Sequence, residues 1–238
     1  MLGQWYTGKI IKIEQATTNT RRYWIEIPEV KNFIFKPGQF VTLDLPIHEQ
    51  RNKRWRSYSI ASWPDNTNII ELIIVFAEHG AGTHYLFEQI QEGSTLALRG
   101  PQGVFTLPAT LDKDIFLICT GTGIAPFRSM LHNIKNKNTP HQNIYLIFGT
   151  RTQKNLLYAD EMQALEKKIV NFKYIPTLSQ EKWSGHTGYV HAIYESLLNK
   201  NIDAQFLLCG WKNMIDEARQ RLQQLGYDKK QILFELYG

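Results

Sequence analysis

Hydrophobic and polar residues alternate in two different rhythms along the chain. From residue 5 to about residue 100, short runs rich in β-branched and aromatic residues are separated by turn clusters such as Lys36-Pro37-Gly38, which is typical of antiparallel strands. One helix is expected to begin near Thr83, and the strands expected around it are Trp5–Ile13, Arg22–Ile27, Gln39–Leu45 and Ile69–Phe76. This half predicts a small antiparallel barrel or sandwich.

After the turn-rich segment Gly100-Pro101-Gln102-Gly103, short apolar strands alternate with longer helical stretches. The expected strands are Ile115–Thr120, Ile144–Gly149, Phe172–Thr177, Gln205–Cys209 and Ile232–Glu235, and the expected helices lie near 125–136, 158–169, 189–199 and 211–225. Such alternation predicts a parallel sheet with helices on both faces, as in Rossmann-like α/β folds. We therefore expect an antiparallel β-barrel domain over residues 1–104 and an α/β domain over residues 105–238, with the boundary near 104–112.

The composition suits two globular domains. A chain of 238 residues is long for one domain, since domains cluster near ~100–150 residues, and 43% hydrophobic residues exclude intrinsic disorder. The net charge of +5 suits an anionic cofactor or an acidic partner but is too small to indicate nucleic acid. No stretch resembles a signal peptide or approaches the ~18–20 apolar residues of a membrane span, so we expect a cytoplasmic protein without membrane insertion.

Only two cysteines occur, Cys119 and Cys209, ninety positions apart. They cannot supply the ligand spacing of a zinc site or the four thiolates of an iron–sulfur cluster, and no disulfide framework is needed. We therefore expect no metal site.

The turn Thr120-Gly121-Thr122-Gly123 follows a predicted parallel strand, at the edge where open α/β sheets bind ligands. Gly121 and Gly123 let the backbone approach a phosphate, the free amides of the helix start carry roughly +0.5 charge, and Pro126 fits the first helical turn. The turn lacks the lysine of a P-loop and the third glycine of GxGxxG. Alone it is equally consistent with dinucleotide binding and with a tight strand-to-helix corner.

In the first half, the segment Arg56-Ser57-Tyr58-Ser59 predicts a strand in which Arg56 and Tyr58 share one face and the serines share the other. Arginine can clamp a pyrophosphate, tyrosine can stack on a ring system, and a serine hydroxyl can bond a heteroatom. Without further context, an ordinary edge strand with exposed polar residues explains the same pattern.

The order of the motifs supplies that context. RxYS at 56–59 is followed by GAGTHYL at 80–86, GPxGxF at 100–105, GTGIAP at 121–126, Cys209-Gly210 with Met214 five residues after the cysteine, and a final Glu-x-Tyr. This order and spacing resemble the ferredoxin–NADP(H) reductase superfamily over essentially the whole chain. The resemblance implies a flavin-binding barrel, a nicotinamide-binding α/β domain, and an oxidoreductase that passes hydride from NAD(P)H to bound FAD, with FMN less favoured.

The resemblance also implies residue roles in the barrel. Arg56 would neutralise the flavin phosphate, Tyr58 would lie against the isoalloxazine, and Ser59 would hydrogen-bond near flavin N5. Gly82 and Thr83 would hold the pyrophosphate through backbone amides and a hydroxyl.

In the second half, the resemblance places the nicotinamide dinucleotide on the 121–126 turn and Cys209 beside the nicotinamide C4. A small buried packing residue is the alternative for Cys209. Glu235 and Tyr237 match the family's Glu-x-Tyr ending, in which the ring covers the flavin and yields to nicotinamide. Because Gly238 follows Tyr237 here, a plain aromatic packing contact is the alternative.

The expected nicotinamide preference follows from missing cations. Members that use NADP(H) commonly carry Ser-Arg after the third α/β strand, because a 2′-phosphate needs cationic partners. The same place here is Ser179-Gln180, which favours NADH. Arg151 and Lys154 follow another strand and are alternative phosphate partners, so NADPH stays a second candidate.

The sequence has no CxxxxCxxC run for a fused ferredoxin, so a separate electron acceptor is expected, such as a ferredoxin, a flavodoxin or an oxygenase component. The basic segment 51–56 is a candidate landing site for an acidic ferredoxin or flavodoxin, and a solvated charged loop is the alternative. Two other functions stay open: an NAD(P)H:flavin reductase with diffusible flavin, and an electron-transfer subunit that depends on a larger complex.

Overall fold

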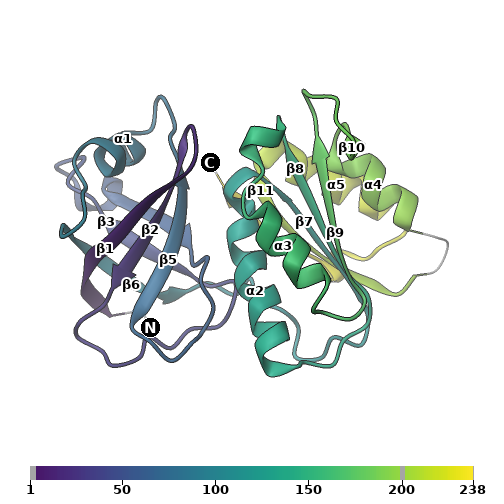
Figure 1. Ribbon diagram of the computed structural model, residues 1–238, viewed down its shortest axis with the longest axis horizontal. Coiled ribbons are helices and arrows are strands. Elements are labelled where there is room, and N and C mark those ends of the chain that lie inside the picture. Colours follow the sequence, from purple (N-terminus) through teal and green to yellow (C-terminus); the bar gives the residue numbers. More distant parts are fainter. Residues whose placement is uncertain (1–3, 199–201, 238) are drawn as a thin grey trace. The chain divides into compact units, whose positions relative to one another are not determined.

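The computed structural model describes residues 4–198 and 202–237. The chain forms two compact units. The first contains the residues up to Thr106 together with Arg128–Met130, and the second contains Leu107–Phe127 and the residues from Leu131 onward. Each unit is built on one six-stranded sheet. Figure 1 shows where each sheet lies along the chain. Gly238 and the end of the helix expected at 189–199 lie outside the described residues.

The first unit is an antiparallel barrel. Its strands are β1 (Trp5–Thr17), β2 (Thr20–Glu26), β3 (Phe40–Asp44), β4 (Trp55–Ser59), β5 (Ile69–Val75) and β6 (Thr95–Gln102), in the order β4-β3-β6-β1-β2-β5. The β1–β2, β2–β5, β1–β6, β3–β6 and β3–β4 pairs are all antiparallel. A bridge between Ile60 and Leu72 joins the two edge strands, so the sheet closes on itself.

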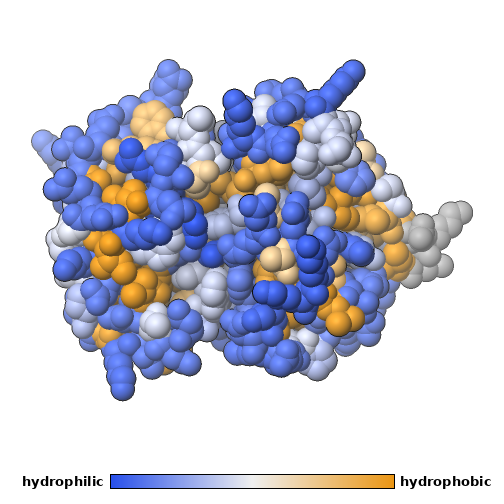
Figure 2. Space-filling view, viewed as in Figure 1, coloured by the Kyte–Doolittle hydropathy of each residue, from blue (hydrophilic) through white to orange (hydrophobic). Residues whose placement is uncertain are grey.

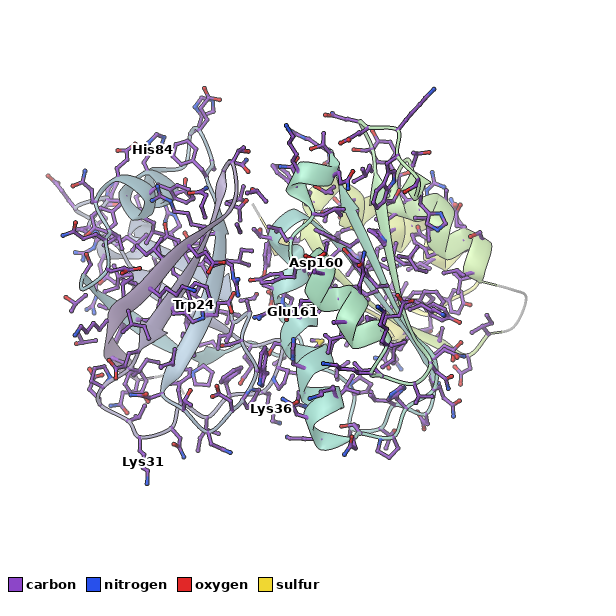
Figure 3. The ribbon with its side chains drawn as sticks, viewed as in Figure 1. Trp24, Lys31, Lys36, His84, Asp160 and Glu161 are labelled. Atoms are coloured by element: carbon purple, nitrogen blue, oxygen red, sulfur yellow. The ribbon has the colours of Figure 1, made fainter. Side chains whose placement is uncertain are left out.

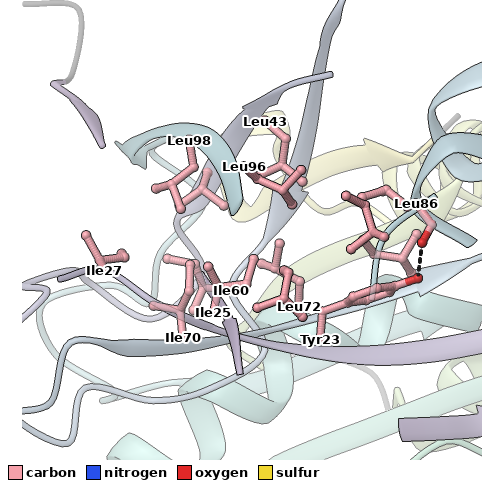
Figure 4. Close-up of a cluster of buried hydrophobic side chains, with 14 of the residues drawn as sticks. Tyr23, Ile25, Ile27, Leu43, Ile60, Ile70, Leu72, Leu86, Leu96 and Leu98 are labelled. Carbon is pink, nitrogen blue, oxygen red and sulfur yellow. Dashed lines mark hydrogen bonds between the residues drawn. The ribbon is translucent and has the colours of Figure 1, made fainter. Parts of the chain in front are cut away.

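The helix α1 (Ala81–Glu88) packs on the barrel core. Its Leu86 is buried in that core, and the Tyr23 hydroxyl donates a hydrogen bond of 3.1 Å to the Leu86 carbonyl oxygen. Figure 4 shows this bond beside the side chains that alternate strand positions send inward, among them Ile25, Leu43 and Leu98. The helix is thereby fixed to β2 and to the barrel core.

The interpretation of residues 100–103 as a turn is wrong, because Gly100-Pro101-Gln102 is the end of β6. This strand lies between β3 and β1. A Cβ atom at Gly100 would lie 2.8 Å from Val41 Cγ1 and 3.2 Å from the Phe40 carbonyl oxygen. The glycine is there because β3 passes too close for a side chain, and not because the chain turns.

The second unit is a parallel sheet covered by helices. Its strands are β7 (Asp114–Thr120), β8 (Ile144–Thr150), β9 (Phe172–Leu178), β10 (His186–Thr187), β11 (Ala204–Trp211) and β12 (Ile232–Tyr237), in the order β10-β9-β8-β7-β11-β12. Its helices are α2 (Ile124–Lys137), α3 (Ala159–Glu166), α4 (Val190–Leu197) and α5 (Lys212–Gln224). All the strand pairs are parallel, which confirms the expected α/β fold, although the two-residue β10 was not predicted.

The strand order reverses between β7 and β11, because β8 to β10 extend the sheet on one side of β7 and β11 to β12 extend it on the other. Helices α4 and α5 pack on one face of the sheet, over Phe116, Phe206 and Leu208. Helices α2 and α3 cover the other face (Figure 1). Ligands of open α/β sheets bind beyond the carboxyl ends of the strands at such a reversal, so the β7 and β11 ends are the place to examine.

On the face drawn in Figure 2, hydrophilic side chains surround scattered hydrophobic groups. Among the residues that the structure describes, no helix has the length and apolarity needed to cross a bilayer.

Leu43→Ala tests the barrel core. Leu43 is fully buried, so its truncation should lower the free energy of unfolding by about 2–5 kcal/mol. Ile11→Ala, at a position that is 38% exposed on β1, is the control and should cost less than about 1 kcal/mol. Urea unfolding followed by circular dichroism measures both, and equal losses would contradict the assigned core.

Candidate flavin and nucleotide sites

Arg56 of β4 lies against the start of α1. A Cβ atom at Gly82 would lie 3.0 Å from Arg56 Cγ and 3.3 Å from Arg56 Nε. The Nη1 group of Arg56 donates to the carbonyl oxygens of Lys53 and Trp55, at 3.0 and 2.8 Å, which holds the side chain in place. A guanidinium and the first amides of a helix therefore stand together, and both bind phosphate oxygens. The structure thus brings together two residues expected at the flavin pyrophosphate.

Tyr58 and Ser59 occupy successive positions of β4 and differ in exposure. Tyr58 is paired with Val41, packs on the barrel core and is half-buried. Burial raises the pKa of the Tyr58 hydroxyl, so the phenol stays neutral. Ser59 is only 4% exposed. The Tyr58 ring, more than the Ser59 hydroxyl, is available to a flat ligand.

The Thr83 hydroxyl is engaged within its own loop. It accepts a hydrogen bond from the Ala77 amide at 3.1 Å and lies within donating distance of the carbonyl oxygens of Ala77 (3.1 Å) and Gly80 (2.9 Å). The loop before α1 is thereby tied to the first turn of the helix. Direct binding of a pyrophosphate by this hydroxyl stays a prediction, whereas its loop contacts are what the structure shows.

The turn after β7 needs glycine at two positions for different reasons. Gly121 has φ +54°, a left-handed conformation that side chains rarely adopt. A Cβ atom at Gly123 would lie 2.7 Å from the carbonyl carbon of Cys209, at the end of β11. Between them, Thr122 is half-buried, and Pro126 is buried in the first turn of α2. The backbone of this turn is therefore held beside the last residues of β11.

A second close approach joins the same two strand ends. Gly210 has φ +137°, and a Cβ atom there would collide with Thr120 Oγ1 and lie 3.0 Å from the Thr120 carbonyl oxygen. The Trp211 amide donates a hydrogen bond of 3.3 Å to Thr120 Oγ1. The carboxyl ends of β7 and β11 thus meet backbone to backbone at the point where the strand order reverses.

Cys209, Glu235 and Tyr237 gather at this point. Cys209 is fully buried and is paired with Glu235 in the β11–β12 register. Burial first, and then the Glu235 carboxylate, raise the pKa of the Cys209 thiol well above its ordinary value, and a hydrogen bond with Tyr237 offsets part of the rise. A thiol in this setting is neutral, so it can pack against a ring but cannot act as a nucleophile.

The loops after β8 and β9 lie side by side. The Ser179 amide donates to the Thr150 carbonyl oxygen and the Gln180 amide to that of Arg151, both at 2.9 Å. The exposed Arg151 guanidinium is therefore attached to a segment next to Ser179, and Glu181 in the same segment accepts a hydrogen bond of 2.8 Å from the Gln153 amide. Two exposed cations of the loop after β8, Arg151 and Lys154, and the Glu181 carboxylate thus lie where a 2′-phosphate partner was expected.

Trp211 is a residue that the sequence analysis did not single out. Its side chain is 64% exposed, and its Nε1 atom lies 4.0 Å from where a Cβ of Gly121 would be. An aromatic residue directly after Cys-Gly at a strand end is the signal that could have revealed it. Within residues 4–198 and 202–237, no group of three or more histidines, cysteines or carboxylates could hold a metal ion.

Two family models match the chain, an oxidoreductase FAD-binding domain over residues 7–107 and an oxidoreductase NAD-binding domain over residues 117–220. A ferredoxin–NADP reductase from Sorangium cellulosum is 31% identical over 242 residues, which cover 98% of this chain and 97% of the relative. The chain belongs to the ferredoxin–NADP reductase family. The family expected from the motif order is confirmed, and so are the oxidoreductase class and the use of FAD and NAD(P).

Other similar proteins match this reductase over different shares of their own length. The electron transfer component of anthranilate 1,2-dioxygenase from Acinetobacter baylyi is 31% identical, but the match covers 82% of this chain and only 56% of that protein. A crystal structure of a ferredoxin–NADP+ reductase from Neisseria gonorrhoeae with bound FAD and NADP is 27% identical, with a TM-score of 0.81 and 98% of each chain covered. A cytochrome P450 reductase from Amycolatopsis, 22% identical with a TM-score of 0.88, covers 98% of this chain and 69% of its own, and shows the fold alone.

The residues present fit both cofactors of this reductase. In the barrel, the missing Cβ of Gly82 leaves a cradle against Arg56, beside helix amides that suit an anionic pyrophosphate. In the α/β unit, the Gly121–Gly123 turn offers its amides next to a neutral thiol. The barrel therefore has groups that suit the FAD pyrophosphate, and the α/β unit has groups that suit a nicotinamide dinucleotide.

Gly123→Ala tests the contact between the Gly121–Gly123 turn and β11. Its Cβ would meet backbone, which cannot move as a side chain can, so the variant should lose about 1–3 kcal/mol of stability and most of its NADH affinity. Gly121→Ala meets no atom closer than 4.0 Å and should show the milder cost of φ strain, about 1–2 kcal/mol. NADH titration and urea unfolding measure both effects, and equal behaviour of the two variants would contradict the close-approach argument.

Proposed function

We propose that this reductase takes hydride from NADH onto FAD and passes the electrons to a separate acidic protein. Residues 1–104 would hold FAD and residues 105–238 the nicotinamide dinucleotide. The observation that carries the proposal is the backbone contact of Gly123 with Cys209, because it sets a dinucleotide turn beside a neutral thiol at the strand reversal. Chemistry at a nicotinamide ring needs binding and orientation here, and no acid–base group.

The residues of the chain would act by binding and orientation. Arg56 and the Gly82 amide would hold the FAD pyrophosphate, and the Tyr58 ring would support the isoalloxazine, with Ser59 near its N5. Bound FAD supplies the capacity to accept a hydride and to release electrons singly.

On the nicotinamide side, Thr122 and Pro126 complete the turn formed by Gly121 and Gly123. Cys209 would border the nicotinamide ring. The Glu235 carboxylate and the Tyr237 hydroxyl act on the pKa of the Cys209 thiol after the larger effect of burial, so both groups lie near this thiol.

The preference for NADH rests on the charges around Ser179. Arg151 and Lys154 could pair with a 2′-phosphate, but Glu181 lies in the adjoining segment and would repel it. A carboxylate can instead accept a hydrogen bond from a ribose hydroxyl, which NADH has and NADPH lacks at this position. Gln180 adds no charge.

In the folded barrel, two arginines of the basic segment 51–56 lie close to one carboxylate. Arg54 pairs with the Asp44 carboxylate at 2.8 Å, and Arg51 approaches the same carboxylate at 3.8 Å. Lys53 is exposed at the end of the short 3-10 turn Arg51–Lys53. The positive charge available to an acidic ferredoxin or flavodoxin is therefore centred on Lys53 more than on Arg54.

Anaerobic titration with NADH and NADPH tests the proposed reaction. The purified protein should retain FAD through gel filtration, and NADH should bleach the flavin absorbance faster than NADPH. Cys209→Ala should keep its flavin, and NADH should bleach that flavin about 3- to 30-fold more slowly, because the nicotinamide ring would lose a side chain that orients it. Flavin lost on the column would favour the diffusible-flavin reductase, and bleaching by neither nucleotide would favour a subunit that depends on a complex.

Lys53→Glu tests the landing site. Reduction of an acidic ferredoxin should slow about 3- to 10-fold at low ionic strength and lose salt sensitivity, while ferricyanide reduction stays unchanged. Lys31→Glu is the matched control, since Lys31 is also exposed but lies outside the basic segment. Equal slowing with both acceptors, or by both variants, would contradict docking at Lys53.

A further inference from the structure

His84 follows Thr83 on α1 and makes a contact through each ring nitrogen. Its Nδ1 lies 2.8 Å from Glu88 Oε1, and its Nε2 lies 2.9 Å from the carbonyl oxygen of Glu78. The ring also packs edgewise on Phe76, with centroids 4.6 Å apart. Figure 3 shows His84 on the helix α1. The side chain thus connects the loop at the end of β5 with the helix that carries Gly82.

Both partners of the ring are hydrogen-bond acceptors. A neutral imidazole has one N–H group and can satisfy only one of them, whereas an imidazolium donates to both. The Glu78 carbonyl oxygen, followed by the Glu88 carboxylate, raises the pKa of His84 above its ordinary value. The geometry and the electrostatics therefore favour the same charged form.

The other charged groups around this loop do not replace His84. Glu78 and His79 have exposed side chains in the loop itself. From β2, Arg21 stacks over the Phe87 ring at 4.6 Å and donates a hydrogen bond of 2.8 Å to the Phe87 carbonyl oxygen. Its guanidinium is thus held one turn along α1, where it fixes the helix rather than the loop.

We infer that the His84 imidazolium is a positioning residue for the FAD pyrophosphate, because it clasps the 77–80 loop onto α1 and so holds the first amides of the helix in place for the phosphates. This rests on the proposed function, in which FAD binds at Gly82. Thr83 closes the loop through contacts that do not titrate, and His84 closes it through contacts that do. The imidazolium also adds a positive charge near an anionic ligand.

The direction of the pH dependence follows. Protonated His84 makes both contacts and attracts the pyrophosphate, so FAD should bind this form more tightly and raise the His84 pKa further. Above the pKa of His84, one ring nitrogen is unprotonated and its lone pair faces either the Glu78 carbonyl oxygen or the Glu88 carboxylate. One of the two contacts is then lost, and the 77–80 loop is held less firmly. FAD affinity should therefore fall as the pH rises through the pKa of His84.

The test measures the FAD dissociation constant of the apoprotein by flavin fluorescence between about pH 5.5 and about pH 9, where imidazole titrates. Wild type should lose about fivefold to tenfold in affinity across the range, since a shift of one pKa unit on binding gives about tenfold. His84→Gln should bind with nearly constant affinity at all these pH values. His79→Gln is the matched control, a second histidine of the same loop, and should keep the wild-type profile.

Glu88→Gln is the second variant, and should flatten part of the profile without removing the imidazole. Circular dichroism and NADH binding by the α/β unit check that each variant is folded. A His84→Gln profile that parallels wild type, or a wild-type profile without slope, would overturn the role of His84 while leaving FAD binding intact. Failure of wild type to bind FAD at any pH would instead contradict the proposed function, and this inference with it.

Discussion

The close backbone contact between β7 and β11 is the constraint on which the α/β unit depends. Gly123 lies on the carbonyl of Cys209, and Gly210 lies on Thr120, so neither strand end tolerates a side chain at the contact. Parallel strands are held in register by their hydrogen bonds, but these two contacts also fix the helices that start there. The Gly121–Gly123 turn and the buried Cys209 thiol are consequently held next to each other by backbone contacts.

In the barrel, side-chain contacts hold the start of the helix α1 in position. The helix α1, proposed to bind the FAD pyrophosphate, is short and lacks a side-chain cap, so by itself it would be only weakly stable. Leu86 and Tyr23 anchor one side of it to the core, and Thr83 and His84 fasten the preceding loop to its first turn. In both units, a glycine packed against a neighbouring strand positions the start of a helix. In the barrel, side chains of the helix hold the preceding loop, whereas in the α/β unit backbone contacts hold the turn.

Periodicity and motif order predicted most of this architecture. Alternation found the barrel strands and the βαβ units, and the spacing of RxYS, GTGIAP and Cys-Gly gave the family. The end of β6 was not predicted as a strand, because glycine and proline at 100 and 101 are residues that commonly form turns. The close approach of β3 is what requires glycine at position 100. The contacts of Thr83 and His84 could not be predicted either, because hydrogen bonds between a helix and the loop before it leave no periodic signal in the sequence. Trp211 was missed because its position near Gly121 comes from the end of β11 and not from a repeated pattern.

The position of β6 has a consequence for how the chain is made. This last strand of the barrel is inserted between β3 and β1, so the earlier strands cannot close until residues 95–102 have left the ribosome. During synthesis, the facing edges of β1 and β3 are therefore exposed together, with Gly100 and Pro101 at the end of the strand that must cover them. A pause or truncation before this strand would leave two unpaired edges open to aggregation.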